Sequence, residues 1–169
     1  DAQFELAKRG NQSIPGLTNA LNASQPQSTR IHVIRALGQI AKDDSEVLSP
    51  VLTLLDDLDD EIRAQAARCL GDQRYVAAFD GLAGRLSDSS LRVRYFAAMG
   101  LGKLGRPDAT MPLLEMLREL NDEDPFLRHA GVMGLAGSGN RTALIEAASD
   151  PARSVRLAVL LAMRRLKLP

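Results

Sequence analysis

The stretch DLDDEIRAQAARCLGD, residues 57–72, decides the fold because its pattern returns along the whole chain. An acidic segment is followed by Ile-Arg, then by small residues, then by Leu-Gly. With Arg63 as anchor, an apolar residue stands directly before the arginine and Leu70 stands seven residues after it. Four other segments keep this frame: TRIHVIRALG (29–38), VRYFAAMGLG (93–102), LRHAGVMGLA (127–136) and VRLAVLLAMR (155–164).

The spacing of the frames is that of a tandem repeat. The anchor arginines are separated by 33, 31, 34 and 28 residues, and they are Arg30, Arg63, Arg94, Arg128 and Arg156. Seven residues after the anchors stand Leu37, Leu70, Leu101, Leu135 and Met163. Six residues before them stand Ser24, Asp57, Asp88, Asp122 and Asp150. Unrelated helices would not hold one register over five copies, so the sequence predicts a repeat protein.

Each frame predicts a helix. Positions −1, +3, +7 and +10 from the arginine are mostly apolar or small, and at about 100° per residue they fall on one stripe. A second amphipathic segment lies between frames, such as EVLSPVLTLL (46–55). Asp-Pro at 124–125 and 150–151 is typical of a helix N-cap followed by proline. The glycines expected at helix ends and turns are Gly71, Gly105 and Gly139.

These patterns predict an all-α protein, a right-handed α-solenoid of about five helix-turn-helix units in one domain, residues 1–169. Each unit buries its apolar face against its neighbours. Residues 1–10 are expected to be the tail of a preceding helix. The expected units are approximately 12–42, 43–74, 75–106, 107–139 and 140–167.

The Asp, apolar-Arg, Ala-Ala, Leu-Gly frame resembles HEAT repeats, in the short bacterial variety shared with phycobilisome-lyase-type repeats. The resemblance covers about residues 12–166. In that family the Asp before the second helix and the Arg within it form a ladder along the stack. The first unit departs from the pattern at Ser24, and Asp124 competes with Asp122 as the cap of unit four. The implied ladder pairs are Asp57–Arg63, Asp88–Arg94, Asp122–Arg128 and Asp150–Arg156.

A narrower resemblance concerns the parent protein. DPFLRHAGVMGLAG (124–137) and SVRLAVLLAMRRL (154–166) are similar to the HEAT segment of large planctomycete-type bacterial proteins. Those join a sugar-dehydrogenase-like propeller, HEAT repeats and a c-type cytochrome, which implies an exported or periplasmic, redox-linked parent. The chain lacks the Cys-x-x-Cys-His motif of that haem. It starts without Met and stops within a helical pattern, so we expect a segment of a longer protein.

Several short motifs suggest chemistry but fit the repeat better. GLGKLG (100–105) matches the dinucleotide-binding G-x-G-x-x-G, yet Gly100 stands in a small-residue position of the helix and Gly105 at its expected end. Cys69 stands in the same small position and is expected to be buried. The acidic runs 56–61 and 121–124 precede helix starts, where carboxylates cap free amides.

No combination of residues supports catalysis. His32 and His129 lie three units apart and cannot share a metal. The sequence has no H-E-x-x-H, no G-x-S-x-G and no Cys–His pair at ligand spacing. Its longest apolar runs are far below the about 20 residues of a membrane span. We therefore expect a non-enzymatic chain without metal, cofactor or membrane span.

A second stripe on each anchor helix, the open stripe, consists of positions +1, +2, +5 and +9 and points away from the core. In HEAT proteins this side is concave and meets partners, which the resemblance implies here. Its middle is rich in aromatic residues and Met, as interface centres are. Tyr95 and His129 are expected to be exposed, whereas Phe96 and Met133 are either exposed or half-buried between helices. The candidate partner-binding residues are His32, Arg35, Gln65, Arg68, Tyr95, Phe96, Met99, Lys103, His129 and Met133.

The leading hypothesis is a non-catalytic scaffold that binds a protein partner or adjacent domains of the parent chain. One alternative is nucleic-acid binding through concave basic residues, against which 21 basic and 21 acidic residues give zero net charge. Another alternative is an accessory domain of a redox or chromophore-handling enzyme. The apolar segment LAVLLAM (157–163) leaves self-association through the C-terminal repeat open.

Overall fold

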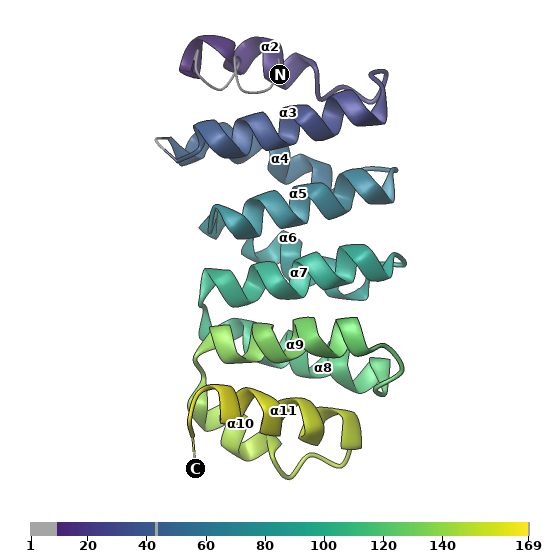
Figure 1. Cartoon of the computed structure of the whole chain (residues 1–169), viewed down its shortest axis with the longest axis vertical. Coiled ribbons are helices and arrows are strands. Elements are labelled where there is room, and N and C mark those ends of the chain that lie inside the picture. Colours follow the sequence, from purple (N-terminus) through teal and green to yellow (C-terminus); the bar gives the residue numbers. More distant parts are fainter. Residues whose placement is uncertain (1–9, 43, 169) are drawn as a thin grey trace.

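The structure, a computed structural model, describes residues 10–42 and 44–168. Every regular element within these ranges is a helix, and they form a single stack with α2 at one end and α10 and α11 at the other (Figure 1). This confirms the predicted all-α solenoid. The predicted tail of a preceding helix lies outside the described residues, apart from Gly10.

The five repeated frames form the long second helices of the units. These lie side by side in one layer of the stack (Figure 1). Their 13 or 14 residues contain each anchor arginine near the N-terminal end. They are α3 (Gln27–Ile40), α5 (Asp60–Asp72), α7 (Leu91–Leu104), α9 (Pro125–Ser138) and α11 (Arg153–Arg165).

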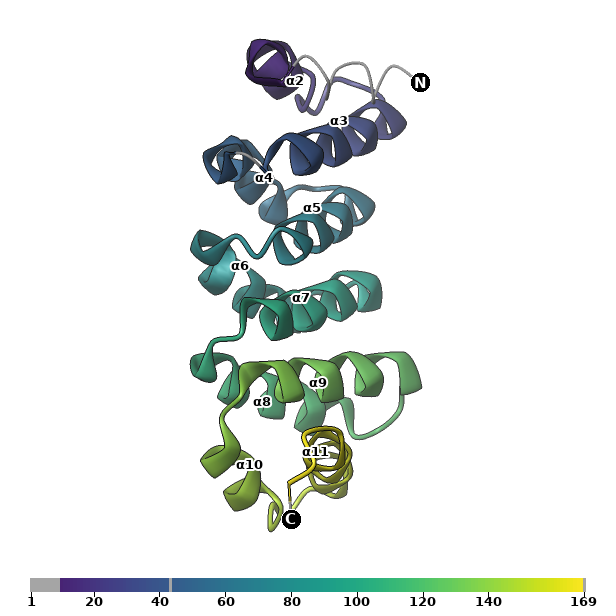
Figure 2. The ribbon, with the colours of Figure 1, turned by 60° about the vertical axis from the view of Figure 1, so that its left-hand side comes forward.

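The first helices form the other layer, which Figure 2 shows beside the second helices. Most are short and flanked by 3₁₀ turns (η). In α6 the glycines at 81 and 84 weaken helix propagation, and in α4 Pro50 occupies the first turn, where its missing N–H is tolerated. In chain order this layer contains η1 (Gly10–Ser13), α2 (Ile14–Asn19), η2 (Ser45–Leu48), α4 (Ser49–Thr53), η3 (Leu54–Asp56), η4 (Val76–Ala78), α6 (Phe79–Gly84), η5 (Arg85–Ser87), η6 (Pro107–Ala109), α8 (Thr110–Leu120) and α10 (Arg141–Ala147).

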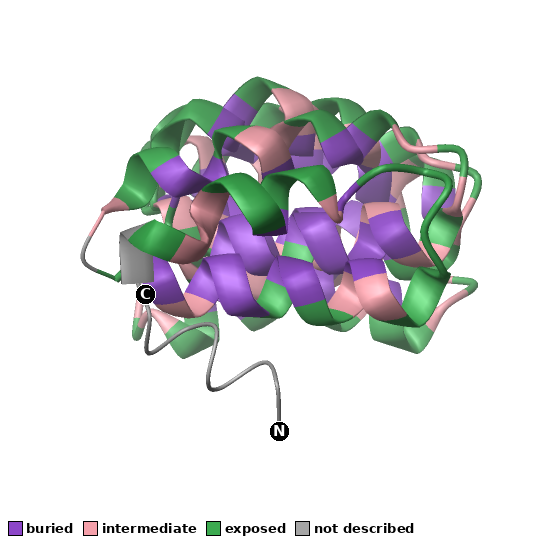
Figure 3. Cartoon of the chain, turned by 90° about the horizontal axis from the view of Figure 1, so that it is seen from above, coloured by how far each residue is buried: buried purple, intermediate pink, exposed green. Residues whose placement is uncertain are grey.

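The core lies between the two layers, where Figure 3 shows the buried residues in a view from above, and it extends along the stack from Leu17 to Met163. It is aliphatic. The +7 residues of the frame are buried in all five units, and so are the apolar residues before Arg63, Arg94, Arg128 and Arg156. The stripe predicted from helical periodicity is therefore the stripe that faces the core.

Some helix boundaries follow the predicted caps and others do not. Asp124 caps α9 by accepting from the backbone N–H groups of Phe126 and Leu127, both at 2.8 Å. Gly105 and Gly139 end α7 and α9 with φ of 69° and 71°, as predicted. The cap predicted at Asp150 is wrong, because α11 begins only at Arg153 and Asp150 accepts from the N–H of Ala152 in the preceding turn.

Gly71 was predicted at a helix end, but it lies inside α5 and has a packing role. A Cβ atom at Gly71 would come within 2.5 Å of the Cα atom of Gly100 in α7. A Cβ atom at Gly102 would likewise come within 2.8 Å of the Cα atom of Gly134 in α9. The second helices thus touch backbone to backbone, and the GLGKLG motif serves helix packing and a helix end.

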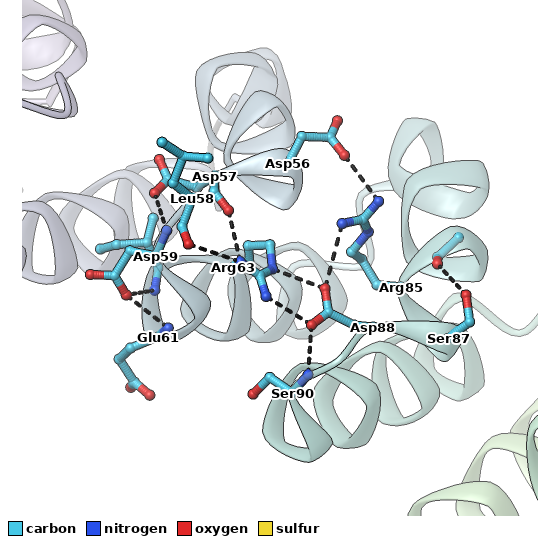
Figure 4. Close-up of polar contacts among 12 residues, drawn as sticks. Asp56, Asp57, Leu58, Asp59, Glu61, Arg63, Arg85, Ser87, Asp88 and Ser90 are labelled. Atoms are coloured by element: carbon cyan, nitrogen blue, oxygen red, sulfur yellow. Dashed lines mark hydrogen bonds and ion pairs between the residues drawn. The ribbon is translucent and has the colours of Figure 1, made fainter.

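The acid–arginine ladder runs between units rather than within them. Arg63 donates from Nε and Nη2 to the carboxylate of Asp88 in the next unit, at 2.9 and 2.8 Å (Figure 4). Arg30 also donates to the carboxylate of Asp57 in the next unit, but from Nη1 and Nη2, while its Nε donates to the carbonyl oxygen of Leu21. The predicted pairs Asp57–Arg63 and Asp88–Arg94 are therefore wrong. The reason is that Nη1 of Arg63 is held by the backbone carbonyl of Asp57 at 2.8 Å, which turns the other edge of the guanidinium toward the following unit.

The last two predicted pairs have different outcomes. Asp122 accepts from Arg128 of its own unit, as expected. Asp150 instead accepts from Arg118 of α8 at 2.7 Å, while Arg156 donates to the carbonyl oxygen of Asp150 and not to its carboxylate.

The fourth unit breaks the ladder. Asn121 and Asp122 both have positive φ, 47° and 67°. Asp122 pairs with Arg128 of its own unit instead of Arg94, the anchor arginine of the preceding unit. Arg94 is left with Nε and Nη2 buried and without a hydrogen-bond partner among the described residues.

The ladder makes stability dependent on pH. Burial by itself raises the pKa of Asp57 and Asp88, but hydrogen bonds from Arg30, Arg63 and backbone N–H groups outweigh it and hold both pKa values below 3.8. A carboxylate whose pKa is lower in the folded state stabilises fully above its unfolded pKa and loses this effect as pH falls toward the folded pKa. We expect the free energy of unfolding to decline below about pH 5, and less steeply in Asp88→Asn, as urea titrations at several pH values would show. Equal slopes in the two proteins would contradict the role of Asp88.

Candidate functional site

The open stripe lies on the second-helix layer, and its predicted residues differ in accessibility. His32, Arg35, Arg68, Lys103 and His129 are exposed, and Tyr95, Phe96, Met99 and Met133 are half-buried. Gln65 is only 4% exposed and donates from Nε2 to Glu61 at 2.7 Å. The prediction that Gln65 meets a partner is therefore corrected: α5 lies between α3 and α7, and this packing covers its side chain.

Tyr95 and Phe96 form an aromatic pair at the centre of the layer. Their rings meet edge to face, with centroids 5.3 Å apart and planes at 85°. The guanidinium groups of Arg92 and Arg68 lie 5.2 and 5.7 Å from the Phe96 ring centroid. Phe96 is half-buried, which is one of the two predicted alternatives. Tyr95 was predicted to be exposed but is also half-buried. The pair is thus a fixed apolar surface with a polar hydroxyl at its edge.

A pocket of about 320 Å³ opens beside this pair, between the N-terminal halves of α7 and α9. Phe126 borders it and is 75% exposed, and Leu91 is also exposed. The residues that line it are Leu91, Arg92, Tyr95, Phe96, Asp124, Phe126 and Leu127. It combines aromatic and aliphatic walls with one basic and one acidic side chain at its rim.

Sequence reasoning missed Leu91 and Phe126 because they stand at −3 and −2, outside the open stripe. The sequence did contain one indication of Phe126. Position −2 is polar in the other four units, with Ser28, Glu61, Arg92 and Ser154. An aromatic residue at the start of a helix, where its equivalents are polar, has no core to fill and indicates a contact site.

The structure divides the aromatic- and Met-rich middle of the open stripe between two grooves. Tyr95, Phe96 and Met99 line a groove of about 180 Å³ between α5 and α7. His129 and Met133 line another groove of about 390 Å³, which α9 forms with α11. A third groove, of about 460 Å³ between α3 and α5, is polar and includes Arg35, Gln39, Lys42, Arg68 and Gln73.

The basic side chains around the aromatic pair each have an acidic partner. Asp72 accepts from Lys103 and lies 3.6 Å from Arg68, and Glu61 pairs with Arg92 at 2.8 Å. Arg35 and Arg165, in contrast, form no ion pair with the residues that the structure describes. The basic groups at the centre of the layer are therefore paired with carboxylates, and unpaired basic groups lie toward the two ends.

Comparison with protein-family models finds HEAT repeats over residues 14–92 and 48–123. The chain belongs to the HEAT-repeat family. Comparison with curated protein sequences finds no match.

Solved structures confirm the fold of this HEAT-repeat chain. The complex of CpcE and CpcF of phycocyanin lyase from Nostoc sp. PCC7120 contains a chain with 23% identity and a TM-score of 0.70. The alignment covers 90% of the HEAT-repeat chain and 64% of that chain, so the present chain spans less than two thirds of it. A designed armadillo repeat protein in complex with the peptide (KR)4 has 18% identity and a TM-score of 0.62, covering 96% and 89% of the two chains. Repeat solenoids of this kind are typical of protein-interaction scaffolds.

Two observations concern metal binding and membrane spans in the HEAT-repeat chain. Residues 10–42 and 44–168 contain no group of three or more His, Cys, Asp or Glu side chains placed to hold a metal ion. Among the helices of this part, none combines the length and the apolar character that a membrane span needs.

The thiol of Cys69 is expected to be unreactive in the folded HEAT-repeat chain. Its Sγ atom is buried and lies 3.6 Å from the carbonyl oxygen of Ile34. Burial, together with the negative charge of Asp72, raises the pKa of the thiol to about 12, which leaves almost no thiolate at neutral pH. A maleimide reagent should label Cys69 only after denaturation, as mass spectrometry would show. Rapid labelling of the native protein would mean that α3 and α5 separate readily.

Proposed function

We propose that this chain is a non-catalytic scaffold that binds a protein partner, or a neighbouring domain of its parent protein, through the open stripe and the α7–α9 pocket. The observation that carries the proposal is Phe126, 75% exposed at the border of a pocket with Tyr95 and Phe96 in its wall. Aromatic side chains beside a preformed pocket are typical anchors of protein interfaces. The pocket sits on helices that pack backbone to backbone, so it needs little ordering before it binds.

The charge pattern supports a partner with an apolar anchor. Arg92 at the pocket rim is already neutralised by Glu61, and Asp124 is occupied by the α9 cap. A partner would gain mainly by burying an aromatic or aliphatic side chain between Tyr95, Phe96 and Phe126. The (KR)4 peptide complex of the designed armadillo protein supports the wider idea that a solenoid of this shape can hold a peptide.

Nucleic-acid binding is less well supported than protein binding. Arg68 and Lys103, two basic residues of the open stripe, share Asp72 as their acidic partner. The unpaired Arg35 and Arg165 belong to the first and last units, so they do not form one continuous basic stripe.

The proposal is tested by comparing Phe126→Ser with a matched control, Leu58→Ser. Leu58 is 100% exposed, also in a turn before a second helix, and it does not line the α7–α9 pocket. Loss of an interface anchor typically costs 2 kcal/mol or more, about 30-fold in affinity. We therefore expect proteins captured from a lysate of the source cells to be retained by the natural chain and by Leu58→Ser, and lost by Phe126→Ser.

Mass spectrometry would identify the captured proteins, and circular dichroism would verify that both variants are folded. A second variant, Tyr95→Asp, probes the other wall of the pocket. The same proteins retained by all variants, or none retained by the natural chain, would overturn the proposal. The segment would then serve as a spacer between domains of its parent.

A further inference from the structure

The open stripe changes in character along the stack, from basic in the first two units to apolar in the last three. Position +5 shows this change most clearly, since it is Arg35 in α3 and Arg68 in α5. In α7, α9 and α11 the same position is Met99, Met133 and Leu161. The helices that carry these side chains lie side by side in chain order (Figure 1). A partner that follows the stripe therefore meets positive charge at one end and apolar surface at the other.

The basic part of the stripe borders the polar groove of about 460 Å³ between α3 and α5. Arg35, Lys42 and Arg68 line this groove and are exposed. Asp72 also lines it, but its carboxylate accepts from Lys103 and lies 3.6 Å from Arg68. Arg35 has no ion pair with the residues that the structure describes. The described walls of the groove therefore carry more positive than negative charge.

Arg35 and Lys42 differ in what they do for the fold. Lys42 directly follows the C-cap of α3, where positive charge offsets the helix dipole. Arg35 lies inside α3 and is exposed, so it stabilises no helix end. The charge of Arg35 is therefore available to a partner.

The basic groove is continuous with the α7–α9 pocket. Arg68 and Asp72 line both the basic groove and the smaller groove between α5 and α7. Tyr95 and Phe96 line both that smaller groove and the α7–α9 pocket. The three depressions thus share walls and follow one another across four second helices. One extended segment of a partner can occupy all three.

The length of such a segment follows from helix geometry. Neighbouring packed helices lie about 8–10 Å apart, so the α3–α5 groove and the α7–α9 pocket are about 16–20 Å apart across the layer. Position +5 lies about 6 Å further along the helix axis than position +1, at about 1.5 Å per residue. The direct span is therefore about 20 Å, which about six residues of extended chain cover at about 3.3 Å each.

From these observations we infer that the partner presents an extended segment with an apolar anchor and, about six residues away, one or more carboxylates. The anchor enters the α7–α9 pocket, and the carboxylates lie against Arg35 and Lys42 in the basic groove. The inference rests on the proposed function, because it takes the pocket as the place of the anchor. It adds the charge of the partner and determines which end of the segment lies over the first two units.

A nucleic acid fits this surface less well than an acidic peptide segment. Phosphates repeat along a strand and need basic side chains along the whole contact. The basic side chains of the groove extend over two helices and are then followed by Tyr95, Phe96 and Met99. A segment that is acidic at one end and apolar at the other matches both parts.

Selection of random displayed peptides, long enough for this span, tests the inference without assuming a sequence. The natural chain is expected to enrich peptides with an aromatic or aliphatic residue about six positions from Asp or Glu. The double variant Arg35→Glu, Lys42→Glu is expected to enrich peptides that keep the anchor and lose the acidic residues. Phe126→Ser is expected to lose the anchor preference. Circular dichroism would verify that the variants are folded.

Fluorescence polarisation with one enriched peptide then measures the contribution of charge. The double variant replaces attraction by repulsion, so we expect about tenfold weaker binding at low salt and little difference at about 1 M salt. Lysine in place of the acidic residues of the peptide should restore binding to the double variant. The matched control Arg141→Glu, Arg153→Glu changes net charge equally, at exposed first residues of α10 and α11, and should bind like the natural chain.

The outcomes separate this inference from the proposed function. Enriched peptides with the anchor but without acidic residues at that distance would overturn the inference and leave the proposed function standing. No enriched peptide, or peptides whose binding Phe126→Ser leaves unchanged, would overturn both. A single-stranded oligonucleotide that binds more tightly than the enriched peptide, and is lost in the double variant, would assign the basic groove to nucleic acid instead.

Discussion

Replacing Arg63 by methionine is expected to lower the free energy of unfolding by about 3–5 kcal/mol, as for a buried ion pair that loses one partner. The carboxylate of Asp88 is 3% exposed and receives two of its hydrogen bonds from Arg63. Without them it keeps the N–H of Ser90 and a longer contact from Arg85 at 3.5 Å. Burial then disfavours its charge with little compensation, and the junction between the second and third units weakens.

Arg94→Met is the matched control, since Arg94 is the same residue of the next frame. Its Nε and Nη2 atoms are buried without acceptors, so methionine removes two unsatisfied donors and keeps most of the apolar volume. We expect this variant to be as stable as the natural protein or more stable. Urea unfolding followed by circular dichroism would compare the two. Equal losses in both variants would mean that the arginines stabilise through packing and not through the ladder.

Gly71→Ala is expected to destabilise by about 1–3 kcal/mol or more, because the core cannot accept the added methyl group without moving a helix. The nearest atom to the new Cβ is the Cα atom of Gly100 at 2.5 Å, which is backbone and cannot rotate away. α5 and α7 would have to separate along their contact. Thermal unfolding would measure the loss.

Gly84→Ala is the control for the glycine effect itself. Gly84 is helical, with φ of −62° and ψ of −28°, and a Cβ atom there meets nothing within 4 Å. Alanine should stabilise this position by about 0.4–1 kcal/mol through the unfolded state. If Gly71→Ala were as stable as Gly84→Ala, the second helices would not be held at the separation described.

Helix positions and the core were predictable because they depend on local periodicity. The +7 residues of all five frames are buried, and the layer of second helices follows from them. Cys69, Gly100 and Gly105 also have the roles that their register predicts.

Contacts between units were harder to predict. Each ladder aspartate has one arginine six residues after it and another in the preceding unit, and spacing alone does not choose between them. The choice depends on which backbone carbonyl oxygens hold the guanidinium, through Nη1 in Arg63 and Arg156 and through Nε in Arg30. The exception at Asp122 depends on the left-handed conformation of Asn121 and Asp122 in one turn. The sequence NDED (121–124) does not predict this conformation.

The candidate site was predicted only in part, because single helices were predictable and contacts between helices were not. Tyr95, Phe96 and Met99 lie together, because α7 alone supplies them. Gln65 was misplaced because its burial is decided by neighbouring helices. Phe126 was missed because the pocket arises between two units, and a stripe drawn on single helices does not include it.

The methionines allow the central claim, that partners bind the second-helix layer, to be measured directly. Met99 and Met133 line grooves on this layer, whereas Met111 is exposed on α8, and Met116 and Met163 are buried. Methyl NMR of ¹³C-methionine-labelled protein would be recorded while a partner captured from the lysate is added. Shifts confined to Met99 and Met133, and absent in Phe126→Ser, are the predicted result. Shifts of Met111 with Met99 and Met133 unchanged would place the partner on the first-helix layer and contradict the proposal.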